Sequence, residues 1–137
     1  MKILLDTNII LDVFLEREPN LEVIEEIFKR IIYQGEIKGY VTANSITDIY
    51  YIAAKRLGKN KTKEKMRDLL KLLEIISVDG HDCFTALDFP ISDFEDAVVV
   101  ACGGKVDIDY IVTNDKDFLA VDSKLASTVS AIDFLAL

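Results

Sequence analysis

The sequence predicts one three-layer α/β/α domain over residues 1–137, with a central, mainly parallel sheet of about five strands. Short apolar runs typical of buried strands alternate with segments whose apolar residues recur every three or four positions. Half of the 137 residues are apolar, so the chain can bury a core of its own. Strands separated by helices favour a parallel sheet covered on both faces.

The first half of the chain contains two expected strands and three expected helices. Residues 2–5 form an apolar run. The next segment has helical spacing with Asn8 near its N-terminus and ends before Pro19, and Gly35 and Gly58 suit helix C-termini. The expected elements are a strand at 2–5, helices at 8–18 and 20–35, a strand at 39–43 and a helix at 44–58.

The second half continues the alternation. Residues 62–74 are amphipathic, whereas the segment 92–104 is apolar on all sides and is therefore expected to be a buried helix. The expected elements are helices at 62–74, 81–88 and 92–104, strands at 75–78 and 110–113, and a last strand with a terminal helical turn within 128–137.

Charge is distributed unevenly. The net charge of −8 argues against binding of nucleic acid by the surface as a whole. However, residues 55–71 hold eight of the sixteen Lys and Arg residues. This basic stretch could bind an RNA backbone, or it could be a solvated helical hairpin, and the sequence is compatible with both.

Cys83 and Cys102 lie in apolar surroundings outside any CxxC motif, so we expect reduced cysteines in a cytoplasmic protein. With the lone His81 they match no familiar zinc spacing. No signal peptide or membrane-spanning run is visible, so we expect no membrane partner.

Four acids fall at one edge of the expected sheet. Asp6 ends the first strand, and Asp115 follows the fourth. Asp48 and Asp96 are expected in the first turns of the helices at 44–58 and 92–104. Because the carboxyl ends of parallel strands and the N-termini of the following helices share one edge, we expect these acids to converge.

Each acid also has a structural reading. Ser45 and Asp48 match a capping box, as do Ser92 and Glu95, and Asp115 could be a turn residue. The second box accounts for Glu95 as a solvated capping acid but leaves Asp96 unexplained. Asp6 is harder to assign a structural role because both neighbouring segments are apolar.

Clustered carboxylates need a counter-charge. Two carboxylates about 4 Å apart repel by about 4 kcal/mol at an effective dielectric constant near 20. An oxygen-only site without His or Cys suits Mg²⁺ or Mn²⁺. Such a metal activates water and neutralises charge on a phosphodiester, so the pattern favours metal-assisted phosphate-ester hydrolysis.

At these residues the sequence resembles PIN-domain ribonucleases, the family that includes VapC-type toxins. Four segments carry the resemblance, which runs nearly end to end: "LLDTNIILDVF", "VTANSITDIYYI", "DFEDAVVVACG" and "YIVTNDKDF". The family commonly has Glu in the second motif, where this chain has the shorter Asp48.

The resemblance implies a site and an activity. Mg²⁺ or Mn²⁺ would be bound by the acidic residues Asp6, Asp48, Asp96 and Asp115. Asn8, Thr113 and Asp117 would orient these carboxylates, although Asp117 could equally be a cap or turn residue. The implied activity is endonucleolytic cleavage of single-stranded RNA. Members of the family are frequently homodimers, and the resemblance implies the toxin of a VapBC-type pair with a protein antitoxin.

The same sequence is compatible with two alternative functions of a PIN fold. A PIN-fold nuclease could process RNA without an antitoxin, or the fold could serve as a non-catalytic binding module. Haloacid-dehalogenase-type enzymes need D-x-D after the first strand, where this chain has Asn8 as the third residue. Receiver domains need paired acids there, whereas Asp6 stands alone. Both of these enzyme classes are therefore disfavoured.

Overall fold

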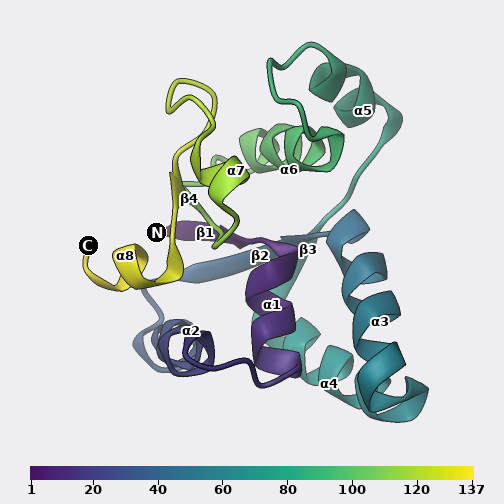
Figure 1. Ribbon diagram of the computed structural model, residues 1–137. Coiled ribbons are helices and arrows are strands. Elements are labelled where there is room, and N and C mark those ends of the chain that lie inside the picture. Colours follow the sequence, from purple (N-terminus) through teal and green to yellow (C-terminus); the bar gives the residue numbers. More distant parts are fainter.

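A computed structural model describes residues 1–137, and its centre is a five-stranded, entirely parallel sheet (Figure 1). The strand order is β3-β2-β1-β4-β5. The strands are β1 (Lys2–Leu5), β2 (Lys38–Thr42), β3 (Leu73–Ile76), β4 (Tyr110–Val112) and β5 (Thr128–Val129). The predicted three-layer parallel fold is confirmed.

Helices cover both faces of the sheet (Figure 1). Ile3 and Leu5 of β1 pack toward one face, and Leu4 packs toward the other, as the alternation of a strand requires. The first face is covered by α1 (Thr7–Phe14), α2 (Asn20–Lys29), α3 (Ala43–Leu57), α4 (Lys59–Leu72) and α8 (Ala131–Leu135). The second is covered by α5 (Gly80–Leu87), α6 (Phe94–Lys105) and α7 (Lys116–Leu119).

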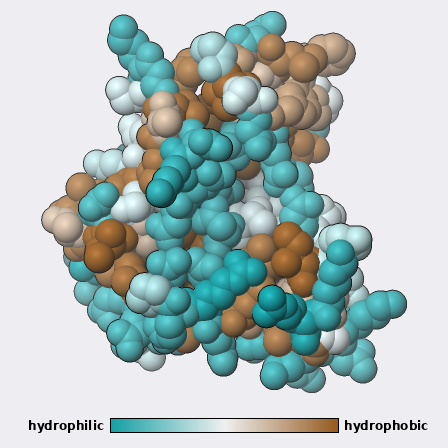
Figure 2. Space-filling model, viewed as in Figure 1, coloured by the Kyte–Doolittle hydropathy of each residue, from teal (hydrophilic) through white to brown (hydrophobic).

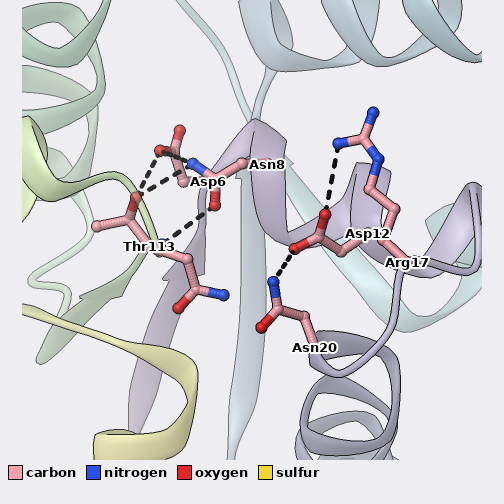
Figure 3. Close-up of polar contacts among 7 residues, drawn as sticks. Asp6, Asn8, Asp12, Arg17, Asn20 and Thr113 are labelled. Atoms are coloured by element: carbon pink, nitrogen blue, oxygen red, sulfur yellow. Dashed lines mark hydrogen bonds and ion pairs between the residues drawn. The ribbon is translucent and has the colours of Figure 1, made fainter.

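The helix predicted at 8–18 is shorter than expected. It begins at Thr7 and ends at Phe14, and Glu16 adopts a positive φ of 51° in the turn that follows. The buried carboxylate of Asp12 holds this turn, because it accepts hydrogen bonds from Arg17 at 3.4 Å and from Asn20 at 3.0 Å (Figure 3). These contacts tie α1 to the start of α2 and reverse the chain.

Other boundaries shift by one to three residues. The helix predicted at 20–35 is α2 followed by a turn of π-helix, η1 (Arg30–Gln34), and it ends at Gly35 with a φ of 64°. The short helix α7 was not predicted. The helix α6 is buried from Asp96 to Gly103, as its apolar sequence indicated. No helix is both long and apolar enough to cross a membrane.

Gly39 provides a test of the packing of β2. A Cβ atom at Gly39 would lie 2.5 Å from Leu73 Cδ2 and 3.0 Å from Ile31 Cδ1. We therefore expect Gly39→Val to lower the free energy of unfolding by about 1–3 kcal/mol in urea denaturation. As a control, Gly104→Ala meets no atom within 4 Å and should leave stability unchanged or raise it by up to about 1 kcal/mol. Equal effects of the two substitutions would contradict this packing argument.

Candidate active site at the carboxyl edge of the sheet

Asp6 lies at the carboxyl end of the central strand β1, where its carboxylate is buried and held by three donors. Its Oδ1 accepts from the Thr7 backbone amide at 2.9 Å, which caps α1. Its Oδ2 accepts from Asn8 Nδ2 and from Thr113 Oγ1, both at 2.9 Å (Figure 3). Burial raises the pKa of Asp6 above its ordinary value, and the nearby charge of Asp115 adds to this rise, although the three hydrogen bonds oppose it.

Asn8 and Thr113 join α1 to the loop after β4. Thr113 is fully buried, and its Oγ1 accepts from Asn8 Nδ2 at 3.2 Å and from the Asp115 amide at 3.1 Å. Asn8 Oδ1 accepts from the Asn114 amide at 3.1 Å. Asn8 therefore contacts both Asp6 and this loop, as the predicted orienting role requires.

The loop after β4 places two further acids. Asp115 is exposed, and its side chain caps α7 by accepting from the Asp117 amide at 2.9 Å. Asp117 therefore lies in the first turn of α7, in agreement with the cap-or-turn reading. The Asp115 side chain acts as a cap and also lies close enough to raise the pKa values of Asp6 and Asp96 by its charge.

The start of α6 differs from the predicted capping box. Asp93, rather than Ser92, is the N-cap residue, and it accepts from the Asp96 amide at 3.1 Å. Asp96 lies in the first turn, as predicted, and only 9% of it is exposed. Burial raises the pKa of Asp96 to about 7, and the negative charges of Asp93, Asp6 and Asp115 add to the rise.

Asp48 lies further along its helix than predicted. Because α3 begins at Ala43, Asp48 is its sixth residue and falls in the second turn. The predicted capping box with Ser45 does not form, since the Ser45 hydroxyl hydrogen-bonds to Thr42 instead, at 3.0 Å. The half-buried Asp48 is therefore free of a capping role.

Glu95 is the site residue that sequence reasoning missed. The neighbouring Asp48 carboxyl group, which is close enough to share a proton with it, raises the pKa of Glu95 to about 7, and loss of solvation and the charges of Asp48 and Asp6 add to the rise. The capping-box motif suggested a solvated cap for Glu95, and Glu95 is indeed exposed, but Asp93 supplies the cap of α6. The position of Glu95 directly before Asp96 in the sequence was the one feature that could have indicated a place near the site.

The structure thus brings the four predicted acids to one edge, in two linked groups. Asp6, Asp96 and Asp115 act on one another by charge, and Asp48 joins them through Glu95. No three of these carboxylates are already arranged as a metal site. The donors are nonetheless all oxygens, which suits a hard cation such as Mg²⁺ or Mn²⁺.

Two unsatisfied oxygens reinforce this fit. The buried Thr7 Oγ1 and Asn44 Oδ1 have no hydrogen-bond partner. Both residues lie in the first turns of helices that start at this edge, α1 and α3. An edge with mutually repelling carboxylates and unpartnered oxygens has the character of a cation site.

Comparison with known families identifies the fold. The PIN domain family profile matches residues 2–117. The chain belongs to the PIN domain family. The match covers β1 through the start of α7 and therefore includes every carboxylate described above.

Individual PIN-domain relatives are distant in sequence but similar in length. Ribonuclease VapC1 of Aquifex aeolicus is 26% identical over 132 residues, which cover 93% of this chain and 90% of that protein. VapC20 of Mycobacterium tuberculosis, a toxin that cleaves the sarcin–ricin loop, superimposes with a TM-score of 0.69 at 13% identity, covering 86% of this chain and 93% of that one. DNA-bound VapBC of Salmonella typhimurium gives a TM-score of 0.69 at 16% identity, covering 96% and 98%.

The raised pKa of Asp96 predicts how stability depends on pH without metal. Between about pH 4 and 7 the folded protein holds a proton on Asp96 that the unfolded chain releases, so this group destabilises the fold as the pH rises through that range. We expect Asp96→Asn in EDTA to raise the free energy of unfolding by about 2 kcal/mol at pH 8 but not at pH 4. Urea denaturation at both values measures this.

The control for this measurement is Asp88→Asn. Asp88 is exposed at the end of α5 and accepts no side-chain hydrogen bond. Its replacement should change stability little at either pH. A loss of stability in Asp96→Asn of the same size at pH 4 and pH 8 would contradict the assigned cause.

Proposed function

We propose that this protein is a Mg²⁺- or Mn²⁺-dependent endoribonuclease that cleaves single-stranded RNA, and that it is the toxin of a VapBC-type toxin–antitoxin pair. The observation that carries the proposal is the convergence of Asp6, Asp96 and Asp115 on one edge, where Asp6 and Asp96 are buried with raised pKa values. The similarity to Ribonuclease VapC1 supports the choice of RNA as substrate.

In this proposal Asp6 and Asp96 bind the metal directly, because they are the most buried carboxylates of the set. Asp48 and Asp115 complete the site, directly or through water, and orient the attacking water. A metal bound there would lower the pKa of a water molecule and neutralise charge on the phosphodiester. Glu95 adds a carboxyl group beside the short Asp48 side chain, and the charges of both Asp48 and Asp6 act on it.

The remaining polar residues fix the geometry. Thr113 and Asn8 each donate to Asp6 Oδ2 and so leave its carboxylate one orientation. Asp117 donates its amide to Asp115 and holds that side chain at the start of α7. These contacts prepare the carboxylates for a cation before substrate arrives.

The proposed partners are a protein antitoxin and a second copy of the chain. The structural similarity to VapBC of Salmonella typhimurium and to a toxin–antitoxin complex from Klebsiella pneumoniae supports the antitoxin. The exposed apolar side chains of Phe84 and Leu87, which lie three residues apart on α5, offer a surface for a homodimer, and Figure 2 shows apolar surface at the top of the view, where α5 lies. The proposed location is the cytoplasm, where free Cys83 and Cys102 would stay reduced.

Loss of the buried carboxylates tests the proposed activity. Asp6→Asn and Asp96→Asn should each lower the rate of cleavage of single-stranded RNA by at least about 100-fold, because each removes a negative charge that binds the metal. EDTA should abolish cleavage, and Mn²⁺ or Mg²⁺ should restore it. The control is Asp88→Asn, which should cleave like the wild type. Undiminished cleavage by an Asp6→Asn/Asp96→Asn double variant would refute the site.

A metal titration separates the nuclease from a non-catalytic PIN-fold module. A nuclease should be stabilised by Mn²⁺ through Asp6 and Asp96, whereas a dead module should bind little of it. If wild-type protein neither cleaves RNA nor is stabilised by Mn²⁺, the non-catalytic module is favoured.

Thr113 tests the orienting contacts. Thr113→Val keeps the shape of the side chain but removes the hydroxyl that donates to Asp6 Oδ2. We expect Mn²⁺ affinity, measured by calorimetry, and the cleavage rate to fall about 10–100-fold. Thr113→Ser restores a hydroxyl and should recover most of both. Equal losses in the Val and Ser variants would show that packing, rather than the hydrogen bond, matters at this position.

A further inference from the structure

A groove of about 810 Å³ runs between α3 and α4 and reaches the site at Asp48. We call it the α3–α4 groove. Its walls combine apolar side chains such as Ile46 and Met66 with the aromatic ring of Tyr51 and the cations Lys63 and Arg67. Asp48 is its only acidic residue, so the groove changes from basic to acidic where it meets the carboxylates.

The cations of the groove are available to a ligand. Lys63 and Arg67 lie four residues apart on α4 and therefore project from one face of that helix. Both are exposed, and neither takes part in an ion pair. Lys55 does not line the groove, and its Nζ lies over one face of the Tyr51 ring, 4.1 Å from the ring centre. Tyr51 itself is 64% exposed.

Five of the eight basic residues at 55–71 fall into two groups that line different cavities. Lys63 and Arg67 face the α3–α4 groove. Lys61 and Lys65, with Arg56, line a separate and smaller cavity beside Phe14 of α1. Only the first group lines a cavity together with an acid of the edge, Asp48.

We propose that the α3–α4 groove binds the single-stranded RNA that enters the active site, with Lys63 and Arg67 contacting its phosphates and Tyr51 stacking on a base. This inference rests on the proposed ribonuclease function. A chain with a net charge of −8 and a cluster of carboxylates repels RNA, so binding needs cations next to the site. An apolar and aromatic floor beside cations suits unpaired bases, which a duplex would keep stacked inside.

A direct test measures RNA binding without cleavage. Full-length protein carrying Asp96→Asn is titrated into a fluorescein-labelled pool of short, random-sequence single-stranded RNA, and anisotropy gives Kd at several salt concentrations. In this background Lys63→Ala/Arg67→Ala should weaken binding at least tenfold. The slope of log K against log salt should become shallower by about 1.4, since each lost phosphate contact contributes about 0.7.

The matched control is Lys59→Ala/Lys61→Ala, which removes the same charge from the same helix outside the α3–α4 groove. It should change Kd by less than about threefold. Tyr51→Ala should weaken binding about tenfold, whereas Tyr51→Phe keeps the ring and should bind like the parent. An equal loss of affinity in Lys63→Ala/Arg67→Ala and in Lys59→Ala/Lys61→Ala would overturn the proposal, because it would show that only overall charge matters.

Two further outcomes also overturn it and separate it from the proposed function. If wild-type protein cleaves RNA and Lys63→Ala/Arg67→Ala cleaves with unchanged KM, the groove fails while the ribonuclease stands. If the pair instead changes the mass measured by light scattering and leaves the salt slope unchanged, a second copy covers the groove. Wild-type protein that neither binds nor cleaves RNA would refute both proposals.

Discussion

The buried carboxylate of Asp6 is the constraint on which the rest of the site depends. It ends the central strand, caps α1 and accepts hydrogen bonds from Thr113 and Asn8, so it joins β1 to the loop after β4. Because β1 lies in the middle of the sheet, between β2 and β4, Asp6 lies at the centre of its carboxyl edge. The hydrogen bonds stabilise a charge that burial opposes, and the pKa of Asp6 remains raised.

The same edge carries a strain that is electrostatic rather than conformational. The pKa values of Asp96 and Glu95 rise to about 7, because like charges and loss of solvation oppose their ionised forms. Carboxylates in this state favour a proton or a cation. A site of this kind lowers the stability of the fold, because a neutral amide at each acidic position would avoid the charge repulsion and the loss of solvation. The unpartnered oxygens of Thr7 and Asn44 at the same edge are consistent with this state.

Positive charge lies beside this edge rather than within it. The carboxylates can attract a metal, but they repel a polyanion, and the chain as a whole is acidic. Lys63 and Arg67 on α4 lie in a groove that begins at Asp48, which separates the residues suited to a cation from those suited to phosphates. The proposed functions of the acidic edge and of the groove are therefore complementary.

The sequence by itself determined the parallel three-layer fold and the convergence of Asp6, Asp96 and Asp115, because strand ends and helix starts share an edge in any parallel sheet. It did not determine the contact of Glu95 with Asp48. That contact depends on which residue caps α6 and on where α3 begins, and a shift of one residue turns a helical side chain by about 100°. The α3–α4 groove likewise depends on tertiary packing, because the two helices must dock before Lys63 and Arg67 can be distinguished from the other cations of the basic stretch.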